Sequence, residues 1–183
     1  MKKFIKSMFI MLCSMMMVSS LVACGSDDDE DGGGGSGSSY ATLTIDGNNY
    51  SVKYAFYIPG EGSNDGSLMF SNINLMGGNL SNSTMWTYCV ISFPNISADN
   101  IPVGEFNQAD IEAFVNQPLS GEEPEIGFGG YCNVKVSKSN DTYTIDVETT
   151  NITDTGGTKN ASINNAKLHF QGKVQDSSSL WRD

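Results

Sequence analysis

The chain has 183 residues, and 21 acidic against 10 basic side chains give it a formal net charge of −11. A surface of that sign repels phosphate backbones, so nucleic acid is excluded as an expected partner. Residues 40–183 are enough for a single domain with its own core, and they contain no apolar run long enough to cross a bilayer.

The first 23 residues have the pattern of a signal peptide. Three lysines within Met1–Lys6 precede the apolar, uncharged run Ser7–Ala23. The run ends in Leu21-Val22-Ala23-Cys24, which resembles the lipobox of bacterial lipoproteins. That resemblance implies that the chain is cut before Cys24 and that Cys24 carries the lipid anchor. An uncleaved membrane anchor is the alternative, but the run is short for a span of about 20 residues.

Residues 24–39 follow as a tether. Five consecutive acids in Asp27–Asp31 form a solvated spacer, and they resemble the acidic export signal of Bacteroidetes lipoproteins that reach the outer face of the outer membrane. Gly32–Ser39 is a flexible Gly/Ser linker. The predicted location is therefore the outer membrane, exposed at the cell surface and held by lipid.

The first half of the domain alternates in the manner of β-strands. Ala41–Ile45 and Tyr50–Ile58 flank the turn Asp46–Asn49, which predicts a hairpin. The apolar phase of Ser67–Leu75 slips by one residue, which predicts a bulge. Met85–Phe93 is apolar on both alternating faces, so it is either a central strand covered on both sides or a strand with an exposed aromatic patch.

A short helix is predicted next, over Gln108–Val115, with Asn107 as its N-cap and Ile111, Phe114 and Val115 on one apolar stripe. Pro118 ends it.

A second hairpin closes the domain together with one last strand. Cys132–Ser137 and Tyr143–Glu148 alternate clearly on either side of a turn, and Thr149–Asn160 is a long polar segment. The last strand, Ala166–Val174, turns His169 to its polar face, where an ordinary surface histidine is expected.

About seven strands in meander order with one helical insertion predict an all-β antiparallel fold, either a β-sandwich or a partly open barrel. The layout runs from Thr-Ile-Asp-Gly-Asn-Asn-Tyr through Ile-Pro-Val-Gly-Glu-Phe to Leu-His-Phe-Gln-Gly-Lys-Val. It resembles the small uncharacterised β-rich surface lipoproteins of gut Bacteroidetes. The resemblance carries over no catalytic or binding residues.

Two cysteines remain in the domain, Cys89 and Cys132. Alternation places both on the core side of their strands, so a disulfide is predicted, worth roughly 4 kcal/mol in the chain-entropy model. Two buried free thiols are the alternative.

No set of residues stands out as catalytic, cofactor-binding or metal-binding. Six acids between Glu105 and Glu125 could hold a hard cation such as calcium, but their spacing matches no calcium loop, and a solvated acidic surface is favoured. Trp86 and Tyr88 lie two residues apart, about 7 Å along one face of a strand. They form either a platform on which sugar rings could stack or part of the core.

Three classes of function follow. The first is a non-catalytic surface module that binds a glycan, a small apolar ligand or a partner protein, and that contacts the membrane through the lipid on Cys24. The second is a component of a surface assembly or pilus-like polymer, which an exposed strand edge would favour. A hydrolase is the third and least supported class.

Overall fold

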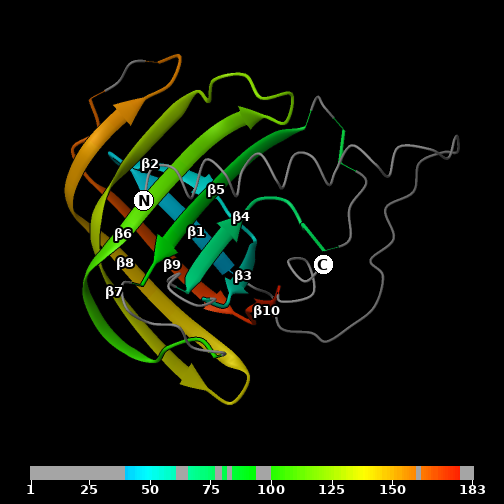
Figure 1. The fold of residues 1–183 in the computed structure, drawn as a ribbon, viewed down its shortest axis with the longest axis vertical. Coiled ribbons are helices and arrows are strands. Elements are labelled where there is room, and N and C mark those ends of the chain that lie inside the picture. Colours follow the sequence, from blue (N-terminus) through cyan, green and yellow to red (C-terminus); the bar gives the residue numbers. More distant parts are fainter. Residues whose placement is uncertain are drawn as a thin grey trace, which may run out of the picture. The chain divides into compact units, whose positions relative to one another are not determined.

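The computed structural model describes residues 40–60, 66–76, 80–81, 84–93, 100–159 and 162–177. These residues contain no helix and form one sheet of ten strands (Figure 1). Residues 1–39, which contain the predicted signal peptide, Cys24 and the predicted tether, lie outside the described residues.

The strands have the following bounds: β1 (Tyr40–Ile45), β2 (Asn48–Ser51), β3 (Tyr54–Ile58), β4 (Ser67–Ser71), β5 (Met85–Ser92), β6 (Gly104–Pro118), β7 (Ile126–Ser139), β8 (Thr142–Gly156), β9 (Ala166–Gly172) and β10 (Gln175–Asp176).

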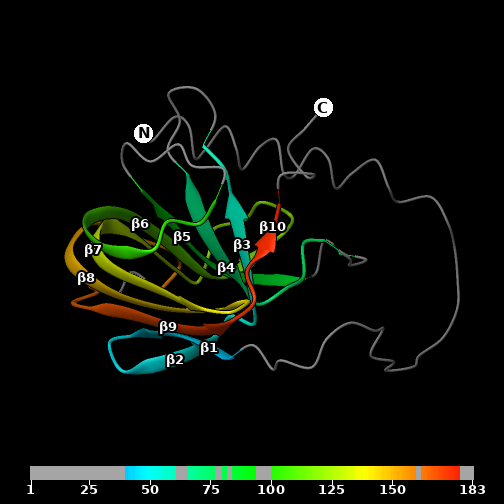
Figure 2. The ribbon, with the colours of Figure 1, turned by 90° about the horizontal axis from the view of Figure 1, so that it is seen from below.

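The sheet is an antiparallel meander with additions at both ends. Strands β3 to β9 are neighbours in chain order, the β1–β2 hairpin pairs beyond β9, and β10 lies parallel to β3 at the other edge. Figure 2 shows how the sheet curls, so that β9 and β1 lie opposite β3 and β4. The all-β prediction is confirmed, and this half-barrel is closer to the partly open barrel than to the sandwich.

The core fills the inside of the curl. It takes alternate residues from β1 and from β3 to β9, such as Leu43, Phe70, Ile91, Ile145 and Phe170, all of them without solvent exposure. Because side chains of a strand alternate between faces, the residues between these core positions point to the outer face of the sheet. That alternation places the polar residues of β7, β8 and β9 on the outside.

The predicted helix over Gln108–Val115 is wrong. These residues lie in β6, paired with β5 on one side and β7 on the other. Burial alternates strictly from Ala109 onward, since Ala109, Ile111, Ala113 and Val115 are buried. The predicted helical stripe did not include Ala109 and Ala113. When they are counted as apolar, the buried positions repeat every two residues rather than every 3.6.

Asn107, the expected N-cap, lies inside β6 instead. The β6–β7 register shifts between Phe106 and Ala109, and Gln108 has a positive φ of 64°. This irregularity is a β-bulge, which bends the strand.

Tyr50–Ile58 was expected to be one strand and is two. β2 pairs with β1, whereas β3 lies at the far side of the sheet against β4. Val52 marks the break: its side chain is fully buried and its N–H donates to the carbonyl of Ala41. The chain crosses the open side of the half-barrel at this point.

Two further boundaries differ from the expected ones. β4 ends at Ser71, so Ile73 and Leu75 follow the strand and the predicted bulge is absent from the described residues. Thr149–Asn160, which the sequence marks only as a long polar segment, belongs to β8 as far as Gly156. Bulges at Thr150 and Thr153 interrupt the alternation by which a strand is recognised in a sequence. The hydroxyls of Thr150 and Thr153 donate to the carbonyls of Tyr131 and Gly129, respectively.

The predicted disulfide is not formed. Cys89 and Cys132 are both fully buried free thiols. β6 runs between them, since Cys89 pairs with Ala113 and Cys132 with Ala109. Strands two apart in a sheet lie about 10 Å from each other, beyond the Cα separation that a disulfide spans. The expectation that both face the core was right, but the strand between them was assigned to a helix.

Candidate functional site

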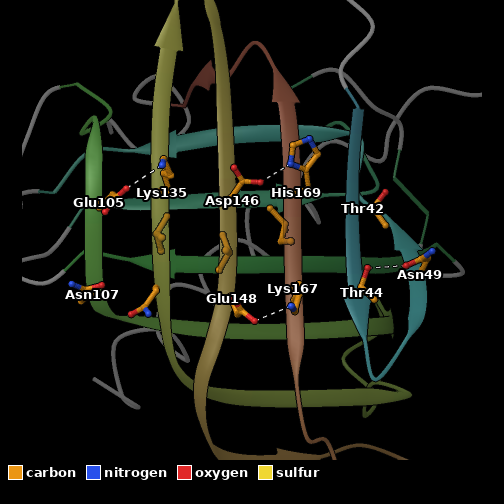
Figure 3. A pocket seen from close by; sticks show the side chains of 14 residues that line it. Thr42, Thr44, Asn49, Glu105, Asn107, Lys135, Asp146, Glu148, Lys167 and His169 are labelled. Atoms are coloured by element: carbon orange, nitrogen blue, oxygen red, sulfur yellow. Dashed lines mark hydrogen bonds and ion pairs between the residues drawn. The ribbon is translucent and has the colours of Figure 1, made fainter.

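The outer face of the sheet is hollowed into a groove of about 720 Å³. We call it the outer groove. Figure 3 shows the polar side chains that line it, which project from neighbouring strands of the sheet. It is lined by Thr42, Thr44, Asn49, Glu105, Asn107, Asn133, Val134, Lys135, Asp146, Val147, Glu148, Lys167, Leu168 and His169.

The strand register arranges the polar side chains in two rows that cross the sheet. In row one, Glu105, Lys135, Asp146, His169 and Thr42 are successive partners from β6 to β1. Residues directly opposite each other on one face of a sheet have their Cβ atoms about 5 Å apart, so each member can contact the next.

Row two runs beside row one, two residues away along each strand. Its members Asn133, Glu148, Lys167, Thr44 and Asn49 are successive partners from β7 to β2. The Thr44 hydroxyl donates to Asn49 Oδ1 over 2.7 Å, which closes this row at the β2 end.

Two ion pairs and one carboxylate–histidine contact involve all six ionisable side chains of the groove. Glu105 lies 3.1 Å from Lys135 Nζ, and Glu148 lies 2.8 Å from Lys167 Nζ. The third contact is a hydrogen bond between Asp146 Oδ1 and His169 Nδ1 over 2.6 Å, which is an ion pair only when His169 is protonated. The six side chains are between 46% and 71% exposed, and exposed pairs contribute only about 0.2–1 kcal/mol each to stability. Such pairs therefore determine the charge and polarity of the groove more than they stabilise the fold.

Between the rows the floor of the groove is strand backbone. Val134, Val147 and Leu168 have their side chains in the core, yet they also line the groove. The outer groove therefore combines a backbone floor with two rows of side-chain donors and acceptors.

Trp86 and Tyr88 are not an open platform. Their exposed fractions are 0% and 3%, and their rings contact each other at a centroid distance of 4.4 Å. Trp86 Nε1 donates to Ser71 Oγ over 2.8 Å, and the Tyr88 hydroxyl donates to Gln117 Oε1 over 3.3 Å. The stacking hypothesis for this pair is thus wrong, and β5 is the central strand covered on both faces.

The buried cysteines offer no reactive thiolate. Burial, with a smaller contribution from Asp110, raises the pKa of Cys132 to about 12. Burial also raises the pKa of Cys89 well above its ordinary value. Thiolate is the nucleophilic form, so both side chains act as small apolar groups at neutral pH.

The acidic residues between Glu105 and Glu125 do not converge. Glu105 pairs with Lys135 in the outer groove, whereas Glu125 pairs with Lys159 and accepts a hydrogen bond from Asn116 Nδ2 over 2.7 Å. Among the described residues, no three His, Cys, Asp or Glu side chains are placed to hold a metal ion. None of the described residues forms a helix that could span a membrane.

The sequence singled out none of the groove residues as a site. His169 was correctly placed on the polar face of its strand, and the rows on β7, β8 and β9 were visible as the polar half of an alternating pattern. Such a pattern is typical of any solvated sheet face. Only the register, which aligns Asp146 with His169 and Glu148 with Lys167, turns it into two rows.

Neither a family model, nor a curated protein, nor a solved structure shows significant similarity to this chain.

Proposed function

We propose that this chain is a lipid-anchored cell-surface module that binds a neutral glycan in the outer groove and catalyses no reaction. The observation that carries the proposal is that the ionisable side chains of the groove contact one another: Glu105 with Lys135 and Glu148 with Lys167 form ion pairs, and the Asp146 carboxylate contacts the His169 ring.

Paired charges favour a neutral ligand. A charged group entering the groove would meet a neighbour of each sign and gain little net attraction. A polyanion would in addition be repelled by a chain of net charge −11. The ligand that gains most is one with many neutral groups that both donate and accept.

Sugar hydroxyls have that property. Each can donate to a carboxylate such as Glu148 and accept from an amine or amide such as Lys167 or Asn49. Hydrogen bonds to charged groups are the stronger ones. Rows one and two flank the floor of the groove, so hydroxyl groups on both edges of a sugar ring find partners.

The arrangement of Asp146, His169 and Thr42 invites comparison with a catalytic triad, because they are successive partners in row one. Two features speak against nucleophilic catalysis. Asp146 and His169 are about half exposed, so water screens the pair. Their backbone groups lie in paired strands, and donors engaged in the sheet ladder cannot also bind an oxyanion.

An assembly role has less support. The two end strands of the sheet, β2 and β10, have only four and two residues. The part of β6 that does not pair with β5, Gly104–Ala109, contains the bulge between Phe106 and Ala109. The part of β8 beyond its pairing with β9, Thr149–Gly156, carries the bulges at Thr150 and Thr153. Short edges and bulges are the means by which proteins prevent strand addition.

The groove is tested with the full-length chain, purified in detergent, by affinity electrophoresis in gels that contain starch, β-1,3-glucan, β-mannan or xylan. Polygalacturonate and heparin serve as polyanions. At least one neutral polysaccharide should retard the chain, and the polyanions should not. Retardation by polyanions alone, or by nothing in the panel, would contradict the proposal.

A matched pair of variants assigns binding to the groove. Lys167→Ala removes a donor from the middle of row two and should weaken binding at least fivefold. Gln171→Ala changes the same face of β9 outside the groove and should leave binding within twofold of the unmodified chain. Equal effects of both variants would place the glycan elsewhere.

Anchoring is tested separately, in cells. Cys24→Ser should abolish labelling by a radioactive fatty acid and leave the precursor uncut at this junction. Replacing Asp27–Asp31 with alanines should keep the protein from the cell surface, which protease treatment of intact cells detects. Undiminished label, or equal protease access, would remove the respective role.

A further inference from the structure

We propose that the outer groove binds an internal stretch of a linear glycan that lies across the strands, with about one sugar ring over each strand. This inference rests on the proposed function. It adds the direction in which the glycan lies, the number of sugar rings that are bound, and the openness of both ends of the groove.

The direction follows from which residues line the groove. Each strand contributes only a short stretch, such as Asn133–Lys135 of β7, Asp146–Glu148 of β8 and Lys167–His169 of β9. Together six neighbouring strands take part, from β6 to β2. The groove is therefore long across the strands and narrow along them, where the two rows lie about 7 Å apart.

The length of the groove sets the number of rings. Six strands are separated by five steps of about 4.8 Å, which gives about 24 Å from Glu105 on β6 to Asn49 on β2. One pyranose ring adds to a linear chain a length close to one strand spacing. About five rings therefore fit, with row one along one side of the chain and row two along the other (Figure 3).

Both ends of the groove are open within the described part of the chain. β5 pairs with β6 only from Asp110 to Pro118, so at Glu105 and Asn107 the outermost strand is β6 itself. At the other end β2 is the last strand of the sheet. A glycan longer than the groove can extend beyond both edges of it, so its recognition does not require either end of the glycan.

An oligosaccharide ladder tests the inference. Oligosaccharides of two to seven rings are prepared from the polysaccharide of the panel that binds most tightly, and each is titrated into the full-length chain by calorimetry. The Kd should fall at least tenfold from two to five rings and change less than twofold beyond. Blocking both chain ends of the six-ring compound should change its Kd less than twofold.

Two variants at the ends of the groove show where the glycan lies. Asn107→Ala at the β6 end and Asn49→Ala at the β2 end should each weaken the six-ring compound several-fold and leave the two-ring compound within twofold. Lys167→Ala at the centre should weaken both compounds, and Gln171→Ala neither.

The outcomes separate the two proposals. Three results would overturn the inference that the glycan crosses the strands while leaving glycan binding in place. They are tightest binding of one or two rings, loss of binding when the glycan ends are blocked, and an effect of only one of the two end variants. Absence of binding to every polysaccharide of the panel would overturn both.

Discussion

Asp46 and Asn165 exchange three hydrogen bonds although 119 positions separate them. The Asn165 N–H and Nδ2 donate to Asp46 Oδ1 over 3.0 and 3.2 Å, and the Asp46 N–H donates to the Asn165 carbonyl over 3.1 Å. The Asn164 N–H donates to the same carboxylate. Asp46 thus joins the β1–β2 turn to the segment that leads into β9, which positions the β9 and β1 parts of the outer groove.

Asp46→Ala should lower the free energy of unfolding by about 2 kcal/mol, since several backbone donors lose a charged acceptor. Urea unfolding followed by circular dichroism measures it. Asp141→Ala, at the exposed tip of the β7–β8 hairpin, is the control and should cost at most about 0.5 kcal/mol. Equal losses in both variants would show that Asp46 does not join the two segments.

Adjacent glycines of β7 should respond differently to alanine. A Cβ at Gly130 would lie 2.1 Å from the carbonyl oxygen of Asn151, whereas a Cβ at Gly129 meets nothing closer than 3.8 Å. Because the obstacle at Gly130 is backbone, no rotamer relieves it, and Gly130→Ala should destabilise by about 3 kcal/mol.

Gly129→Ala should change stability by less than about 1 kcal/mol. Thermal unfolding of the two variants compares them directly. If Gly130→Ala were as stable as Gly129→Ala, the close approach of β8 to β7 at this bulge would be refuted.

The ion pair of Glu125 with Lys159 should make stability depend on pH. Hydrogen bonding to Lys159, then to Asn116, lowers the pKa of Glu125 below its ordinary value of 4.5. A carboxyl group whose folded pKa is lowered stabilises the protein above its unfolded pKa, and this contribution is lost as pH falls through the folded value. Glu125→Gln should therefore be less stable than the unmodified chain at pH 6 and equal to it near pH 2.

Urea midpoints measured between pH 2 and pH 7 check this. Glu123→Gln, on the same connection, should follow the unmodified profile throughout. A constant difference between Glu125→Gln and the unmodified chain at all pH values would mean that packing, and not the charge, accounts for the effect.

The sequence specified the fold best where a turn and a clear alternation agreed. Ser139–Asp141 sets the β7–β8 register, so the pairing of Lys135 with Asp146 could have been derived from the turn alone. The pairing of Asp146 with His169 could not, because the connection from β8 to β9 is long and its length does not fix the register.

Small or bulged residues account for the main errors. Ala109 and Ala113 carry the alternation of β6 but give a weak apolar signal, so the larger Ile111, Phe114 and Val115 suggested a helix. Once that strand was missing from the prediction, Cys89 and Cys132 fell on neighbouring strands and a disulfide followed. A local error in one element thus became an error in a long-range contact.

Cys89 and Cys132 should be unreactive in the native chain and free in the unfolded one. Their burial and raised pKa values keep both thiols protonated. Iodoacetamide followed by mass spectrometry of the two peptides should find less than about a tenth of each modified without denaturant and full modification in guanidinium without reductant. A Cys89–Cys132 linked peptide under the second condition would contradict the free thiols.

The hydrogen bond from Trp86 Nε1 to Ser71 Oγ should be measurable as a coupling between β5 and β4, since both side chains are fully buried. Trp86→Phe and Ser71→Ala should each destabilise, and the double variant should destabilise by about 1 kcal/mol less than their sum. Urea unfolding of the four proteins in the cycle gives this difference. Trp86→Phe combined with Ser137→Ala, an exposed residue of β7, should instead be additive within about 0.5 kcal/mol. Equal coupling of Trp86→Phe to Ser71→Ala and to Ser137→Ala would mean that the effect spreads through the sheet rather than through this bond. Coupling to Ser71→Ala alone would show that the Trp86–Ser71 hydrogen bond holds β5 and β4 together.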